Sequence, residues 1–227
     1  MKKIISIMML MIISLSVYAN DIYINQSGAT LDLDVLQDGQ NNTIGSSSTA
    51  SSVIGATTNL AITQIGDSNV MTFDVNGATY TGTFSVTGNS NNIDFNCDSG
   101  GSNSSCGTAT ASVVWVGSSN DIDIDIGETS SATGATVSIT GASGSDSNTV
   151  LATIDGNSAI LTLSINGDTN NFLVDIDGNG DSIGHTYVHT HTGSIADVDI
   201  TQSGIYDNMI TLTTSGDNHD IDIIQRD

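Results

Sequence analysis

The stretch from Ile62 to Gly77, ITQIGDSNVMTFDVNG, decides how this chain folds. Apolar and polar residues alternate on both sides of its central Gly-Asp-Ser-Asn corner, which predicts two short strands joined by a tight turn. The glycine at Gly77 predicts a second turn after the second strand. The unit is therefore a strand, a turn, a strand and another turn.

The same frame recurs along the chain, and its glycines show the period. Gly55, Gly66, Gly77 and Gly88 are each 11 residues apart. A repeat of this length, doubled to about 22, is typical of stacked architectures in which no single unit can bury its apolar side alone. We predict an all-β fold, a two-strand-per-turn β-solenoid of about eight stacked coils with loop insertions. The residues expected in its core include Ile62, Met71, Phe73, Val75, Trp115, Ile124, Ile165, Phe172 and Ile176.

Trp115 stands where Gln64 stands in the first unit, and in this place we interpret it as a large core side chain rather than a ligand platform. Two polar stretches, Ser46 to Ser52 and Glu128 to Gly134, interrupt the alternation and predict loops that project from corners.

The first 19 residues have the composition of a secretory signal peptide. Lys2 and Lys3 precede an apolar run from Ile4 to Val17, and a small residue, Ala19, marks the expected cleavage site. The run is too short for a membrane span with ordinary flanks. We therefore expect export, followed by a single repeat domain over residues 20–227.

The expected mature chain is strongly acidic. Without Lys2 and Lys3, one of the three Lys and Arg residues remains, Arg226, against 25 Asp and Glu, so the formal charge is 1 − 25 = −24. Nucleic acid and anionic membranes are poor partners for such a surface. The polar composition, rich in Gly, Ser, Thr, Asn and Asp, would also suit a disordered chain, but the regular apolar alternation argues against disorder.

Cys97 and Cys106 flank a polar loop of Gly, Ser and Asn residues. In an exported chain, a pair this close most simply forms one disulfide that closes a short surface loop. Two thiols without a nearby His are too few ligands for a zinc site.

A motif of the form Gln-x-Gly-x-x-Asn-x-apolar runs through the repeats. Its residues are Gln26, Gly28, Gln37, Gly39, Asn42, Gln64, Gly66, Asn69, Gln202, Gly204 and Asn208. The motif resembles the curlin repeat of the curli fibre subunits of Gram-negative bacteria. The resemblance spans Ile22 to Gln225 and is strict in only a few units, because Val86, Ile165 or Thr214 elsewhere replaces the Gln.

The resemblance implies a secreted, non-enzymatic subunit that assembles end to end with itself or with related subunits into an amyloid-like fibre. Such a fibre belongs to the cell surface and the biofilm matrix and adheres to host or abiotic surfaces. Inward Gln and Asn side chains would form ladders along the stacking axis, and open strand edges would template the next subunit. A main subunit and a nucleating subunit both fit. The alternative from another class is a monomeric secreted adhesin or carbohydrate-binding module.

Aspartates alternate with apolar residues in several strands, as at Asp121, Asp123 and Asp125, and predict a solvated acidic face. Carboxylates stacked between coils would repel one another, so we expect salt, and especially Ca²⁺, to stabilise the fold. No catalytic arrangement is apparent, and no cofactor is expected beyond weakly bound calcium.

Two sets of residues are weak candidates for metal ligands. Asp175, Asp177 and Asp181 resemble the first half of an EF-hand loop, although Thr186 stands where the loop needs Glu. His185, His189 and His191 share strand parity and are candidates for Zn²⁺ or Cu²⁺, but an exposed polar loop is the favoured interpretation.

Thr79, Thr81 and Thr83 resemble the threonine arrays of ice-binding solenoids. The spacing in the sequence does not predict threonines at one position in successive coils, so this interpretation is set aside.

Overall fold

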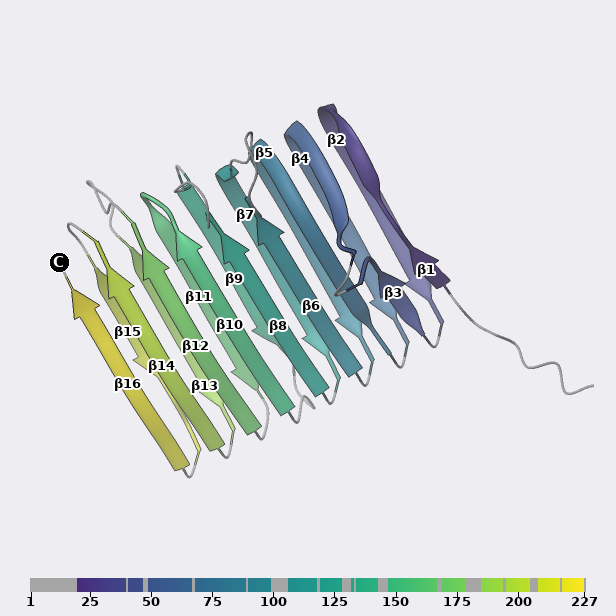
Figure 1. Ribbon diagram of the computed structural model, residues 1–227. Coiled ribbons are helices and arrows are strands. Elements are labelled where there is room, and N and C mark those ends of the chain that lie inside the picture. Colours follow the sequence, from purple (N-terminus) through teal and green to yellow (C-terminus); the bar gives the residue numbers. More distant parts are fainter. Residues whose placement is uncertain are drawn as a thin grey trace, which may run out of the picture.

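A computed structural model shows an all-β protein in which two rows of parallel strands enclose a narrow core (Figure 1). It describes residues 20–39, 41–46, 49–66, 68–88, 90–98, 106–117, 119–127, 132, 134–142, 147–166, 169–178, 185–193, 195–204, 208–216 and 218–226. The expected signal peptide, residues 1–19, lies outside this part of the chain. No helix within it is long and apolar enough to cross a membrane.

Sixteen strands follow one another along the chain. They are β1 (Asn20–Ile22), β2 (Asn25–Asp38), β3 (Asn42–Ile44), β4 (Ser51–Ile65), β5 (Val70–Thr87), β6 (Ser90–Cys97), β7 (Cys106–Val116), β8 (Ser119–Ile126), β9 (Gly134–Gly141), β10 (Ser147–Asp155), β11 (Ala159–Asn166), β12 (Thr169–Asp177), β13 (Thr186–Thr192), β14 (Ile195–Ser203), β15 (Met209–Thr213) and β16 (Asn218–Arg226).

Each strand pairs in parallel with the strand one turn before it and the strand one turn after it. One row runs β1, β3, the first half of β5, β6, β8, β10, β12, β14 and β16. The other row runs β2, β4, the second half of β5, β7, β9, β11, β13 and β15. Because the chain crosses from one row to the other at every corner, the fold is a parallel β-solenoid, as predicted.

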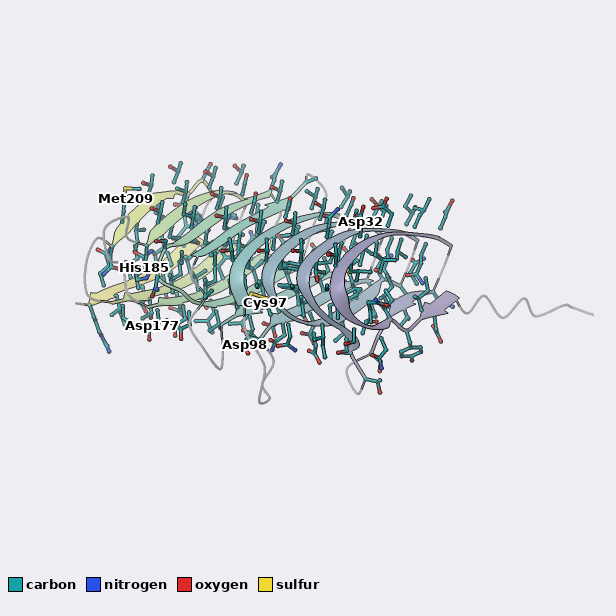
Figure 2. All side chains as sticks on the ribbon, turned by 90° about the horizontal axis from the view of Figure 1, so that it is seen from above. Asp32, Cys97, Asp98, Asp177, His185 and Met209 are labelled. Carbon is teal, nitrogen blue, oxygen red and sulfur yellow. A yellow bond between two sulfur atoms is a disulfide. The ribbon has the colours of Figure 1, made fainter. Side chains whose placement is uncertain are left out.

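The solenoid has about six turns, and the predicted eight coils are not confirmed. From β5 onward, each turn contributes a strand of at least five residues to each row. At the N-terminal end, β1 and β3 are only three residues long, and β2 and β4 curve around the corner within one strand (Figure 2).

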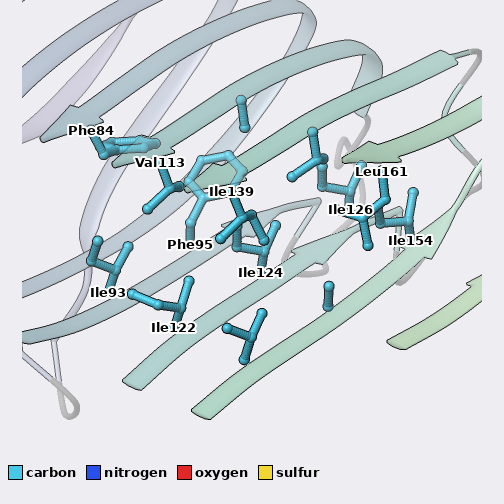
Figure 3. Close-up of a cluster of buried hydrophobic side chains, with 14 of the residues drawn as sticks. Phe84, Ile93, Phe95, Val113, Ile122, Ile124, Ile126, Ile139, Ile154 and Leu161 are labelled. Atoms are coloured by element: carbon cyan, nitrogen blue, oxygen red, sulfur yellow. The ribbon is translucent and has the colours of Figure 1, made fainter. Parts of the chain in front are cut away.

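Apolar residues fill the space between the rows because they take every second position in each strand. All nine predicted core residues are buried, with exposed fractions of at most 2%. Figure 3 shows Phe84, Val113 and Ile139, one column of one row, and Ile93 and Ile122, one column of the other. The register therefore stacks side chains of similar kind along the axis.

Trp115 lies in the inward column that begins with Gln37 and Gln64 and continues through Val86. The next residue of the column is Gly141. A Cβ atom at Gly141 would lie 2.6 Å from Cζ2 of the Trp115 ring. The indole therefore occupies space that the glycine leaves free in the next turn, and Trp115 is fully buried.

Candidate functional site: inward ladders, outward faces and open ends

A ladder of asparagine amides runs through the core beside the corner at which β3, β5, β6, β8 and β10 begin. The amide of Asn69 donates to Oδ1 of Asn42 at 2.8 Å, and that of Asn91 donates to Asn69 at 2.6 Å. Asn120 donates to Asn91 at 2.5 Å, and Asn148 donates in turn to Asn120. All five side chains are at most 3% exposed. The three inner amides, Asn69, Asn91 and Asn120, each accept from the following turn and donate to the preceding one, which satisfies polar groups that would be costly to bury alone.

Among the predicted ladder residues, Asn42 and Asn69 belong to this ladder, and its continuation through Asn91 and Asn120 was not predicted as a site. The signal for it was present, since each of these residues follows a corner glycine at the same spacing. Asn208 is not a member, because it accepts from Nδ1 of His185 and donates to the backbone of Arg226.

The glutamines pair only near the two ends of the stack. Gln64 donates to Oε1 of Gln37 at 2.7 Å near the N-terminal end, and Gln225 donates to Gln202 at 3.2 Å at the C-terminal end. Gln26 aligns with Val53 in the register, so it has no Gln neighbour in the next turn. Between the ends, apolar residues replace the Gln, and the asparagines carry the hydrogen bonding.

Corner glycines stack directly on one another along the axis. Gly66 has a φ of 147°, in the region that favours glycine, and a Cβ there would lie 1.4 Å from the carbonyl oxygen of Gly39. The same overlap occurs between Gly88 and Gly66, at 1.6 Å. No side chain fits these corners. The predicted Gly204 is a third case, with a φ of 146° and Gly178 O at 1.9 Å, whereas a Cβ at Gly28 would only touch Nε2 of Gln26, at 3.6 Å.

Cys97 and Cys106 form the disulfide, with an S–S distance of 2.02 Å. It joins the end of β6 to the start of β7, and both sulfur-bearing side chains are buried. The residues between 98 and 106 lie outside the described part of the chain.

One outward face carries the acidic residues. The row from β6 to β16 presents Asp94, Asp121, Asp123, Asp125, Asp155, Asp175, Asp177, Asp197, Asp199, Asp220 and Asp222 between its inward apolar residues. The register aligns four pairs of them on adjacent strands: Asp94 with Asp123, Asp155 with Asp177, Asp197 with Asp220, and Asp199 with Asp222.

Burial and neighbouring carboxylates raise the pKa of two of these acids. Burial raises the pKa of Asp94, and the charges of Asp74 and Asp121 raise it further. Burial likewise raises the pKa of Asp175, with a second contribution from Asp177. Ionised carboxylates on this face therefore repel one another, as the alternation in the sequence suggested.

The histidine segment differs from the prediction. An exposed polar loop was favoured, but His185, His189 and His191 are all buried at 1% exposure or less, and the last two lie within β13. The prediction was wrong because histidine can replace an apolar residue at an inward strand position when its nitrogens find partners. Tyr187 supplies one such partner, since its hydroxyl lies 2.8 Å from Nδ1 of His189.

Aromatic and ring contacts surround these histidines. The ring of Phe172 lies 5.0 Å from that of His189 and 5.8 Å from that of His191. His191 also contacts the ring of His219 at 5.6 Å and the amide of Asn170. Burial, and then the nearby His191 and His219, lower the pKa of His189 to about 4.

Within the described residues, neither set of candidate metal ligands is brought together. Asp175 and Asp177 are exposed neighbours on β12, and Asp181 lies outside the described residues. Across the described ranges, no group of three or more His, Cys, Asp or Glu side chains is arranged to hold a metal ion.

The two ends of the solenoid are open. Among the described strands, β1 and β2 pair on one side only at the N-terminal end, and β15 and β16 do so at the C-terminal end. Ile223 shows the consequence. It continues the inward column of Ile124, Ala152, Val174 and Ile200, which are at most 1% exposed, yet Ile223 is 44% exposed because none of the described strands covers it.

Comparison with known proteins gives no relative: no family model, no curated protein and no solved structure matches the chain. The arguments for function therefore come from the sequence and from the geometry above.

Proposed function

We propose that this chain is an exported structural or nucleating subunit of a curli-like amyloid fibre at the cell surface of a Gram-negative bacterium, with about eight coils per subunit when the short N-terminal turns are included. The subunit is not an enzyme. It acts in adhesion and in the biofilm matrix. The motif Gln-x-Gly-x-x-Asn-x-apolar and its resemblance to the curlin repeat support this assignment, as does the inward amide ladder.

The observation that carries the proposal is the exposed inward column at the C-terminal end. Ile223 lies in an inward column yet is 44% exposed, and among the described strands β16 is paired along one edge only. Repeat proteins that remain monomeric need terminal repeats with a polar outer surface, because an uncovered repeat leaves apolar residues in water. In the proposed fibre, β1 and β2 of a second copy cover β16 and β15 and extend both rows.

The test uses residues 20–227 at micromolar concentration, with thioflavin fluorescence and negative-stain microscopy. We expect fibres from the wild-type chain and loss of fibres from Ile223→Lys, because a charge at the uncovered inward position would be buried by the next copy. Leu173→Lys is the matched control, since Leu173 is similarly exposed, at 48%, but points outward from β12. Wild-type protein that stays monomeric, or equal loss of fibres in both variants, would contradict the proposal and favour a monomeric adhesin.

We also propose weak calcium binding along the acidic face. Two carboxylates about 4.8 Å apart in water repel by roughly 0.9 kcal/mol before screening, and four pairs of aspartates are in register. Thermal melts in millimolar calcium should therefore lie above melts in chelator at the same ionic strength. Superimposed melts would refute calcium binding without bearing on fibre formation.

A further inference from the structure

The outward face opposite the acidic one is rich in hydroxyl groups. We define the threonine face as the partly or fully exposed Ser and Thr residues on the outward side of this row, in β5, β7, β9, β11, β13 and β15: Thr79, Thr81, Thr83, Ser85, Thr87, Thr108, Thr110, Ser112, Thr136, Ser138, Thr140, Thr162, Ser164, Thr186, Thr190, Thr192, Thr211 and Thr213. In a chain with 25 acids, the strands β4, β7, β9, β11, β13 and β15 contain no Asp, Glu, Lys or Arg.

The hydroxyl groups recur at the same position in successive turns, contrary to the expectation from the sequence. One column contains Thr83, Ser112, Ser138 and Thr162. A second contains Thr140, Ser164, Thr190 and Thr213. A third contains Thr81, Thr110 and Thr136. The expectation failed because loop insertions change the spacing along the chain while the parallel register restores the alignment.

The columns form a two-dimensional array. Neighbouring strands place equivalent side chains about 4.8 Å apart, and alternate residues along one strand lie about 6.6 Å apart. Figure 1 shows the strands of this row side by side and parallel. The parallel backbone pairing of these strands fixes the register of the array, so its spacing is set by the backbone rather than by mobile side chains.

Several classes of partner fit this face poorly. Protein interfaces are enriched in aromatic residues, Met and Arg at their core, and among the described outward residues of these strands only Met209, at the end of the stack, is of that kind. Sugar rings stack on exposed aromatic rings, but the aromatic residues of these strands, such as Tyr80, Phe84 and Trp115, are buried. Anionic ligands have no cation to bind within the threonine face as defined.

A repeated array of the same uncharged group complements a ligand that is itself periodic. Crystalline water is such a ligand: its donors and acceptors repeat in two directions at spacings of a few ångström, and it carries no net charge. A threonine hydroxyl both donates and accepts a hydrogen bond, as a lattice water does, and its methyl group fills space between ordered waters. We propose that the threonine face binds ice.

The inference is independent of fibre formation, because the face lies on the side of the solenoid and the fibre contacts lie at its ends. Ile223→Lys, which is designed to remain monomeric, is therefore a suitable background for the test. The measurements are thermal hysteresis, and the fraction of protein incorporated into slowly grown ice.

Thr162→Tyr places a bulky ring in the middle of the threonine face, at an exposed outward position. We expect it to lose incorporation into ice while it keeps the parent melting temperature. The matched control is Thr149→Tyr, which makes the same change at an exposed outward position of β10, on the acidic face. It should be incorporated as the parent is.

Three results would overturn the inference. The first is a parent protein with no thermal hysteresis and no incorporation into ice. The second is equal loss in both tyrosine variants. The third is a different ligand for the same face, shown by concentration-dependent dimers, or retention on cellulose or chitin, that Thr162→Tyr abolishes while ice binding is absent.

Discussion

Replacing Asn120 with Ala tests whether the Asn ladder holds the turns in register. Asn120 donates to Asn91 and accepts from Asn148, so its removal leaves an acceptor and a donor without partners in a site that is at most 3% exposed. Each unsatisfied buried group costs about 1–3 kcal/mol, so the free energy of unfolding should fall by about 2–5 kcal/mol. Urea unfolding followed by the fluorescence of Trp115 measures this loss, because the chain has one Trp and it is buried.

Two further variants make this prediction quantitative. Asn42→Ala removes the end of the ladder and leaves only the Asn69 donor unpaired, so it should cost about half as much as Asn120→Ala. Asn59→Ala removes an exposed hydrogen bond to Asp32 and should change stability by no more than about 0.5 kcal/mol. The reasoning is refuted if Asn120→Ala destabilises the protein no more than Asn59→Ala does.

Three other perturbations have defined outcomes. The folded state keeps the pKa of His189 near 4, so below about pH 6.5 the unfolded state binds more protons than the folded state does. The free energy of unfolding should therefore fall by about 3 kcal/mol as the pH drops to about 4. Urea midpoints measured across this range should show the fall, and in His189→Phe the midpoints should depend less on pH. Gly141→Ala should cost about 1–3 kcal/mol through the clash with the indole ring, whereas Gly134→Ala, with open space around it, should be close to neutral in the same assay. Reduction of the Cys97–Cys106 disulfide, which closes a loop of nine residues, should lower stability by about 3 kcal/mol, and unchanged thermal melts with and without reductant would contradict this.

The candidate site was partly predictable from local pattern. Asn42 and Asn69 were found because the motif places each a fixed distance after a glycine, and Asn91 and Asn120 follow the same rule. His189 was missed because polarity alone suggested exposure, whereas its place in an inward column, beside aromatic rings, depends on contacts between turns.

The sequence by itself determined the fold class, the inward apolar residues and the corners. Alternation with a period of two selects which side chains can share one face of a strand, and recurrent glycines permit turns that no other residue fits. Only the tertiary structure decided which residues of distant turns lie side by side. The parallel register aligns Thr83 with Ser112 and Asp197 with Asp220. Backbone hydrogen bonds between strands fix these neighbours, whereas the number of residues between turns varies because the corner insertions differ in length. It also decided that Ile223, inward by pattern, is exposed, because burial of that column requires a neighbouring strand on each side and β16 has one on a single side among the described strands.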